Sequence, residues 1–115
     1  MSQLLGNAFA AELDWKPKDE TTTVRTGARY LDGIAAGTAV DVWGAEVGEI
    51  QGSSTDEIFV VLEGKAEVTF HRTGETIVIG PGDVVRLFAG HTNTWRTIET
   101  IRKVSFYVPP VASGS

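Results

Sequence analysis

The strongest constraint on the fold is an alternation of apolar and polar residues with a period of two. In the segment 65–71, Ala66, Val68 and Phe70 alternate with charged or polar residues. Because successive side chains of a β-strand point to opposite faces of a sheet, this pattern predicts strands with one buried face. Thirteen glycines separate such runs along the chain. Short strands spaced by about 8–12 residues are typical of a β-sandwich or β-barrel.

Several segments carry this strand pattern, and turns rich in glycine or polar residues separate them. A strand or extended loop is predicted at Thr21–Asp32, and a polar strand with a turn at Glu49–Thr55. Further strands are predicted at Thr38–Val47, Glu57–Leu62, Lys65–His71, Thr76–Ile79, Val84–Phe88, Thr92–Ile98 and Arg102–Val108. Arg72–Glu75 is predicted to be a hairpin turn and Gly80–Asp83 a tight turn. The sequence therefore predicts an all-β fold.

Helical spacing appears only near the beginning of the chain. Leu5, Phe9 and Leu13 are four residues apart, which predicts one or two amphipathic turns capped near Asn7. Phe9 and Trp15 are expected to pack these turns onto the rest of the chain. A proline two residues after the tryptophan ends the helical spacing, because it disfavours helix at the residue before it.

Length and composition indicate one globular domain. The 115 residues leave no room for two domains, and 42% hydrophobic with 22% charged residues is an ordinary globular composition. We expect an arm at residues 1–20, a β-barrel at 21–110 and a flexible tail at 111–115. The chain contains no cysteine, which excludes disulfides, thiolate metal sites and cysteine nucleophiles and fits a reducing compartment.

Charge and hydropathy argue against two classes of partner. Fifteen acidic and ten basic residues give a net charge of -5, so no basic stripe is available to neutralise nucleic-acid phosphates. The opening residues lack the positive start and long apolar run of a signal peptide. No segment approaches the roughly 20 apolar residues of a membrane-spanning helix. We therefore expect a cytoplasmic protein that binds neither nucleic acid nor membranes.

Two segments resemble the two sequence motifs of the cupin family. Glu57–Gly64, in which a glutamate precedes a glycine by seven positions, is similar to the second half of the first motif. Gly80–Val85 followed by Phe88–Gly90 is similar to the second motif. The segments Gly90–Trp95 and Thr100–Val104 resemble one branch in particular. It consists of small single-domain cupins akin to the ethanolamine-utilisation and ureidoglycine-aminohydrolase proteins.

This resemblance, which spans about residues 40–108, implies both a fold and a partner. The implied fold is the jelly-roll β-barrel of RmlC-like cupins, made of two antiparallel sheets, with a short N-terminal arm or helix. Cupins of this kind usually pair as homodimers through edge strands, which also removes an aggregation hazard. The barrel interior is the implied place for a small-molecule ligand.

Most residues that bind metal in cupins are missing from this chain. A metal-binding cupin carries His-x-His shortly before the glutamate and another histidine three residues after the second-motif glycine. Here those positions are Gln51, Ser53 and Asn93, and only Glu57 remains of the four usual ligands. One carboxylate with two amides and a hydroxyl is a poor donor set for a divalent transition metal. We therefore expect a site without a metal cofactor, with an atypical divalent-metal site as the alternative.

Strand alternation places a set of candidate ligand-binding side chains inside the barrel. They are Gln51, Ser53, Glu57, Phe59 and Val61, together with Asn93 and Trp95 from the facing strand. Arg86 joins them if Val84 points inward, whereas the opposite register places Val85 and Leu87 inside. An inward Arg86 would bind a ligand carboxylate in bidentate fashion.

Glu57 is the candidate catalytic residue. In a mostly apolar cavity, desolvation would favour its protonated form and suit it to general acid or base catalysis. An inward Arg86 would instead keep it ionised. The structural alternative is an acid that is only hydrogen-bonded to Gln51 or paired with Arg86.

The remaining polar and aromatic residues have both structural and functional interpretations. His71 is expected to be solvated beside its hairpin turn. His91 stands at the barrel mouth, either as a rim residue or as a ligand-binding proton shuttle. Trp43, Trp95 and Tyr107 are core residues or pocket walls. The adjacent Arg102 and Lys103 are expected to be surface charge.

Three functions remain open at this stage, and the sequence does not decide whether the chain is an enzyme. The first is a metal-free cavity that binds a small organic molecule such as a carboxylate. In this case Glu57 would catalyse a non-redox isomerase, lyase or cyclase-type step. The second is a divalent-metal cupin enzyme that uses Glu57, His91 and Gln51. The third is a non-catalytic binding or scaffold cupin.

Overall fold

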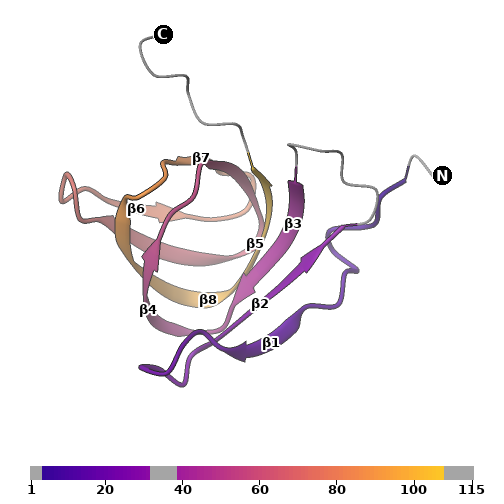
Figure 1. Cartoon of the computed structure of the whole chain (residues 1–115), viewed down its shortest axis with the longest axis horizontal. Helices are drawn as coiled ribbons and strands as arrows, with labels where there is room; N and C mark the ends of the chain where they lie inside the picture. The colour runs from indigo at the N-terminus through magenta and orange to yellow at the C-terminus, as the bar shows by residue number, and fades with distance from the viewer. Residues whose placement is uncertain (1–3, 32–38, 108–115) are drawn as a thin grey trace, which may run out of the picture.

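The computed structural model describes residues 4–31 and 39–107, and this part of the chain is all-β (Figure 1). Its strands are β1 (Asp14–Pro17), β2 (Arg25–Tyr30), β3 (Ala39–Ala45), β4 (Gly48–Ser53), β5 (Glu57–Phe70), β6 (Thr76–Ile79), β7 (Val84–Leu87) and β8 (Thr92–Tyr107). Every strand pairing is antiparallel. The predicted all-β fold is confirmed. The predicted tail and the predicted strand ends at Thr38 and Val108 lie outside the described residues.

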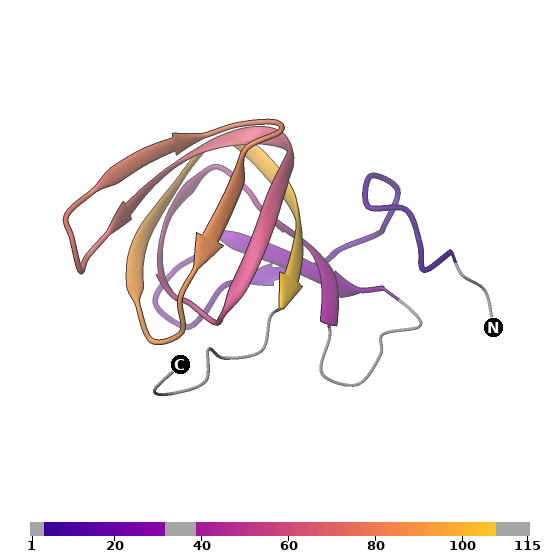
Figure 2. The same ribbon diagram turned by 90° about the horizontal axis from the view of Figure 1, so that it is seen from above.

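Two long strands build both halves of the barrel. The early part of β5, Glu57–Val60, pairs with β7, and its later part, Ala66–Thr69, pairs with β6. Likewise β8 pairs with β4 over Thr92–Thr97 and with β3 over Ile101–Tyr107. Because β5 and β8 also pair with each other along their length, the two expected sheets are halves of one continuous sheet. Seen from above, the strands curve around a common interior (Figure 2).

The segment 57–71 was predicted as two strands separated at Glu63 and Gly64, and the structure corrects this to one bent strand. The register between β5 and β8 shifts between Val61 and Ala66, so the strand turns a corner there and continues. Gly64 has a φ of 88°, a conformation that residues with a Cβ rarely adopt. The separate strands predicted at Thr92–Ile98 and Arg102–Val108 are likewise one strand, β8.

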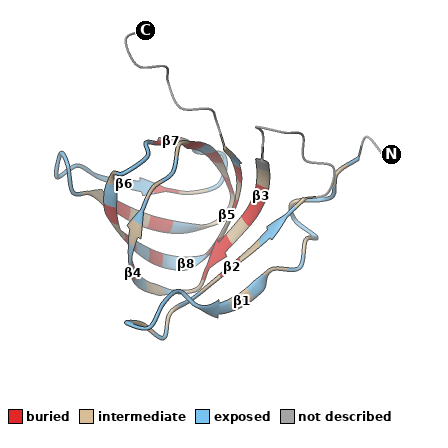
Figure 3. Cartoon of the chain, viewed as in Figure 1, coloured by how far each residue is buried: buried red, intermediate tan, exposed pale blue. Residues whose placement is uncertain are grey.

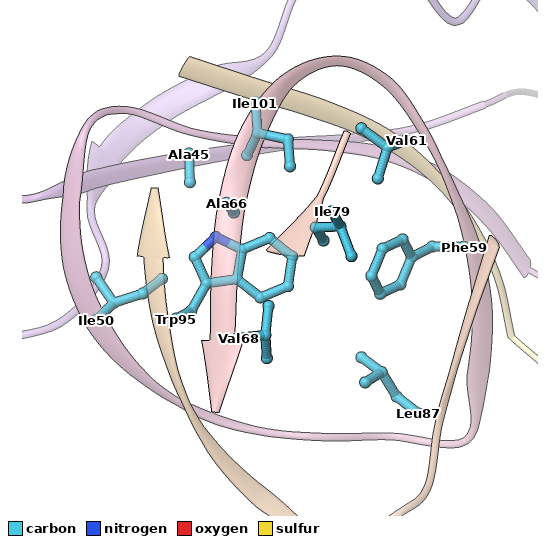
Figure 4. Close-up of a cluster of buried hydrophobic side chains, with 10 residues drawn as sticks. All are labelled: Ala45, Ile50, Phe59, Val61, Ala66, Val68, Ile79, Leu87, Trp95 and Ile101. Carbon is cyan, nitrogen blue, oxygen red and sulfur yellow. The ribbon is translucent and has the colours of Figure 1, made fainter. Parts of the chain in front are cut away.

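The core lies on the inner side of the curved sheet, and Figure 3 shows buried stretches along β3, β5 and β8. Its buried residues are Ala45, Ile50, Phe59, Val61, Ala66, Val68, Ile79, Leu87, Trp95 and Ile101. Figure 4 shows the Trp95 indole among side chains that come from several different strands. These residues alternate with exposed or half-buried ones along β5 and β8, which confirms the period-two pattern. Within the described residues, no helix is long and apolar enough to span a membrane.

The predicted N-terminal helix is reduced to a single turn. The Asn7 side chain caps it, since Oδ1 accepts hydrogen bonds from the backbone N–H groups of Phe9 and Ala10 at 2.9 and 3.0 Å. Phe9 is 61% exposed, so its predicted packing against the core is wrong. One turn buries too little apolar surface to continue as a helix.

The segment after this turn forms β1, a strand that was not predicted. β1 pairs with β2 so that Trp15 stands opposite Gly27. A Cβ built on Gly27 or Gly44 would come within 3.0 or 2.9 Å of the Trp15 ring, so the indole lies against two bare stretches of backbone. The expected packing of Trp15 onto the rest of the chain is therefore confirmed, although by a strand.

The corner of β5 yields a stability prediction. A Cβ on Gly64 would lie 2.2 Å from the carbonyl oxygen of Thr100, whereas Gly74, with a φ of 76°, has nothing within 4 Å of its Cβ position. Gly74→Ala should cost about 1 kcal/mol of unfolding free energy through backbone strain alone. Gly64→Ala should cost at least about 3 kcal/mol, because the backbone clash adds to the strain. Urea denaturation measures both, and equal losses would contradict the proposed corner geometry.

Candidate functional site

A cavity of about 330 Å³ lies between the strands of the barrel and opens to solvent. Its walls include Trp43 from β3, Ile50 from β4, Glu57 from β5, Leu87 from β7, and Trp95 and Lys103 from β8. Ile50, Trp95 and Leu87 can be followed in Figure 4. Three exposed residues, Lys18, Ser53 and Thr55, also line the cavity, so it reaches solvent on their side.

A buried ion pair forms one wall of this cavity. The Lys103 ammonium donates to Glu57 Oε2 at 3.2 Å, and the two side chains are only 7% and 10% exposed. The pair joins β5 to β8, where Glu57 is the register partner of Tyr107 and Lys103 that of Val61. Thr55 donates to the other carboxylate oxygen at 3.3 Å. Removing two charges from water is costly, so each group depends on its partner.

Aromatic rings surround the ammonium. Lys103 Nζ lies 4.0 Å from the centroid of Phe59, 4.9 Å from that of Trp43 and 5.6 Å from that of Trp95. These distances allow cation–π attraction, which favours the charged form. Burial acts in the opposite direction and more strongly, and it lowers the pKa of Lys103 even though the Glu57 carboxylate raises it.

A second carboxyl group, Asp41, extends the buried polar cluster. Asp41 on β3 is 3% exposed, and its Oδ2 accepts from the Tyr107 hydroxyl at 3.2 Å. Burial raises the pKa of Asp41, and burial together with the nearby carboxylates raises the pKa of Tyr107. Asp41 Oδ1 and the hydroxyl of its register partner Ser105 have no hydrogen-bond partner among the described residues. Two buried polar atoms are thus left for water or a ligand.

Four of the predicted site residues lie where they were expected. Glu57, Asn93 and Trp95 are buried and line the cavity. Asn93 Nδ2 donates to Ser54 Oγ at 3.3 Å, and Trp95 Nε1 donates to Thr97 Oγ1 at 3.0 Å. Phe59 is fully buried and meets the site through the Lys103 ammonium. Whether these residues bind a ligand remains a prediction.

The sequence predicted the wrong face of β4 to point into the barrel. Gln51 is exposed and accepts a hydrogen bond from Thr94, while its neighbours Ile50 and Gly52 line the cavity and stand opposite Trp95 and Asn93. The interior positions were counted backward from Glu57 through residues 54–56, which are not strand, so alternation did not carry across them. Ser53 is an exposed residue at the cavity mouth rather than an interior one.

Arg86 takes the outward register. Its neighbours Val85 and Leu87 are the residues that pack against the core, which is the alternative left open by the sequence. The Arg86 guanidinium pairs with Asp56 at 3.4 Å and lies 4.5 Å from the centroid of Phe88. It does not line the barrel cavity, and its predicted pairing with Glu57 through the side chains is replaced by the Lys103 pair.

Both histidines lie away from the buried ion pair. His91 packs against Phe88, and its Nε2 lies 3.1 Å from an Arg72 guanidinium nitrogen at a smaller surface cavity. Because arginine only donates, this nitrogen of His91 must be the unprotonated one. His71 is exposed, as predicted, and its ring nitrogens contact the hydroxyls of Thr92 and Thr94 at 2.8 Å.

The expectation that Lys103 is surface charge is wrong, and it conceals the main feature of the site. Ile101, Lys103 and Ser105 are buried at alternate positions of β8, so the lysine belongs to the inner face. Arg102 points the other way, donates to the backbone carbonyls of Ala8 and Ala11, and fixes the N-terminal turn. Lys103 lies two residues after Ile101, so strand alternation would have placed both on the inner face. This conflicts with the usual exposure of lysine. Asp41 was missed for the same reason.

The residues present do not fit the metal centre of metal-binding cupins. Of the four aligned positions, Gln51 is exposed outside the cavity and Ser53 lies at its mouth, which leaves Glu57 and Asn93. Glu57 is engaged by an ammonium ion, which already supplies a positive charge at its carboxylate. Among residues 4–31 and 39–107, no three histidine, cysteine, aspartate or glutamate side chains form a cluster suited to a metal.

Comparison with known proteins places this geometry in context. The model of the EutQ-like cupin domain family matches residues 36–104. A DUF861 family protein from Thermotoga maritima is 37% identical over 56% of this chain and 73% of its own length, with a TM-score of 0.53. The EutQ protein of Clostridium difficile is 12% identical, with a TM-score of 0.70 over 82% of this chain and 76% of its own. No curated protein matches the chain.

A third similar structure is a putative ethanolamine utilization protein Q from Salmonella typhimurium. It is 21% identical and covers 87% of this chain and 98% of its own, with a TM-score of 0.63. At 12% and 21% identity, the two EutQ structures support the fold alone.

The ion pair yields a prediction for a double-mutant cycle. Glu57→Gln and Lys103→Met should each lower the unfolding free energy by about 3–5 kcal/mol, because each leaves a buried charge without its partner. The double variant should recover more than half of the summed loss. Arg96→Met, which breaks the exposed pair with Glu67, is the matched control and should have little effect. Strictly additive losses in urea denaturation would contradict the coupling.

Proposed function

This chain belongs to the EutQ-like cupin domain family, and we propose that its barrel cavity binds a small oxygen-bearing organic molecule and that Glu57 transfers a proton to or from it. The observation that carries this proposal is the Glu57–Lys103 pair, which is buried yet lines a cavity that reaches solvent. A buried ion pair is weak evidence for stability, because apolar residues would do as well. Buried titratable groups in a concave site favour a functional role.

The Lys103 ammonium supports the choice of ligand. An ammonium has three N–H donors, and among the described residues one of them is directed to Glu57. A carbonyl or carboxylate oxygen of a ligand would accept a second. The unpartnered Ser105 hydroxyl and the Asn93 amide line the same cavity and would bind further polar groups. Lys103 thus takes the place that the sequence assigned to Arg86.

The position of Glu57 supports the proton-transfer step. Its carboxylate stands at the cavity wall with one oxygen on the ammonium and the other near the Thr55 hydroxyl. A ligand whose carbonyl is polarised by the ammonium has more acidic neighbouring C–H bonds, and the adjacent carboxylate is the group to remove such a proton. Isomerase, lyase and cyclase-type reactions use a step of this kind.

The cavity itself favours binding over a scaffold role. A scaffold cupin would fill its barrel with its own side chains, whereas here about 330 Å³ is left beside charged groups. That volume lies at the lower end of the range for small-molecule pockets, which extends from about 300 to 1,000 Å³. We therefore propose a ligand smaller than a typical drug molecule.

Tryptophan fluorescence tests ligand binding directly, because Trp43 and Trp95 line the cavity. Small hydroxy acids and oxo acids should change the emission in a saturable manner, and Lys103→Met should weaken binding by at least about tenfold, since a charged hydrogen bond is worth roughly 1.5–3 kcal/mol. Arg86→Ala is the matched control, because Arg86 lies outside this cavity.

Turnover separates catalysis from binding. Once a ligand that reacts is found, Glu57→Gln should retain the fluorescence response and lose about a hundredfold or more in rate. Full turnover by this variant would contradict the role of Glu57, and an effect of Arg86→Ala equal to that of Lys103→Met would contradict the location of the site.

A further inference from the structure

We infer that Lys103 is a covalent nucleophile, whose ε-amine forms an imine with a small polar aldehyde or ketone inside the barrel cavity. The inference deepens the proposed function, on which it rests, by naming the substrate class and a second reacting group. It starts from the contrast among the four lysines of the chain. Lys16, Lys18 and Lys65 are exposed, whereas Lys103 is buried and lines the cavity.

An amine must lose its proton before it attacks a carbonyl carbon, and Glu57 is placed to take that proton. The two groups are 3.2 Å apart and directly hydrogen-bonded. Transfer of one proton converts the ion pair into a neutral amine and a neutral acid. The two side chains are only 7% and 10% exposed. Burial therefore penalises the charged pair more than the neutral one, although the cation–π contacts favour the ammonium. Desolvation of this kind is one way in which proteins activate lysine as a nucleophile.

The cavity also contains a hydrogen-bonding group for the oxygen of the substrate. Ser105 is two residues beyond Lys103 on the same face of β8, about 7 Å along the strand. Its hydroxyl lines the cavity, is 1% exposed and has no partner among the described residues. A carbonyl carbon bound at Nζ would therefore have its oxygen or a neighbouring hydroxyl within reach of an unused hydrogen-bonding group. The polar Ser54 and Asn93 would face the rest of a polar substrate.

The reaction balances without an oxidant or reductant. Lys103 gives one proton to Glu57, its nitrogen lone pair forms the C–N bond, and the carbonyl π electrons move to oxygen. A proton then moves from nitrogen to that oxygen, which gives a neutral carbinolamine. The Glu57 acid returns its proton to the hydroxyl, which leaves as water while the C=N bond forms. The product is an iminium cation beside the Glu57 carboxylate, so the buried pair keeps its charges.

Reductive trapping tests this inference on the intact wild-type protein. Glyoxylate, glycolaldehyde, pyruvate and dihydroxyacetone are each added with sodium cyanoborohydride, and the modified residue is located by peptide mass spectrometry. We expect a stable adduct on Lys103 with at least one probe, formed at least tenfold faster than on Lys16, Lys18 or Lys65. Glu57→Gln should slow this adduct by about a hundredfold, because the acid that protonates the departing hydroxyl is lost. Lys65→Arg is the matched control and should leave it unchanged.

The adduct is mapped on the wild-type protein, so a folding defect in Lys103→Met would not affect the result. Adducts confined to the exposed lysines would overturn the inference. Glycolate and lactate, which lack the carbonyl group, then separate it from the proposed function. A tryptophan response to them without any adduct on Lys103 would overturn imine formation and leave the binding cavity standing. No tryptophan response and no Lys103 adduct with any probe would contradict both the inference and the proposed function.

Discussion

The ion pair between Glu57 and Lys103 links the two long strands of the barrel and forms one wall of its cavity. Both groups are removed from water, and neither has another charged partner as close among the described residues. They lie on β5 and β8, the two strands that turn the corners and connect both halves of the sheet. A slip of one residue between these strands would separate the two charges and reverse the inner and outer faces. The strands that form the barrel are therefore also the strands that build its site.

In this chain, a lysine supplies the positive charge beside Glu57. In a metal-binding cupin, the glutamate of the first motif is one of four ligands. Here three of those positions hold Gln51, Ser53 and Asn93, and the ammonium of Lys103 contacts the remaining carboxylate. The aromatic rings around it add cation–π attraction. An ammonium differs from a metal ion in that it can lose a proton, and the proposed chemistry follows from this property.

The sequence predicted the fold well because alternation and turn residues act locally. Strand β6 was predicted with its observed bounds, and Asn93 and Trp95 were placed inside from alternation within one strand. Alternation failed where a turn intervened, as at Gln51, because parity is not conserved through a non-strand segment. At Lys103, alternation from Ile101 gives the observed buried position, but the usual exposure of lysine was given more weight. The partner of a buried charge lies on another strand, so a single sequence does not reveal it.

The most direct test of this account is the titration of Lys103 itself, followed by NMR of its side-chain nitrogen and ε-carbon. We expect the pKa of Lys103 to lie below the ordinary value of 10.5, because the ammonium is buried. It also predicts that Glu57→Gln lowers the pKa further, because the carboxylate stabilises the ammonium. A Lys103 pKa at or above 10.5 that does not respond to Glu57→Gln would contradict the buried pair.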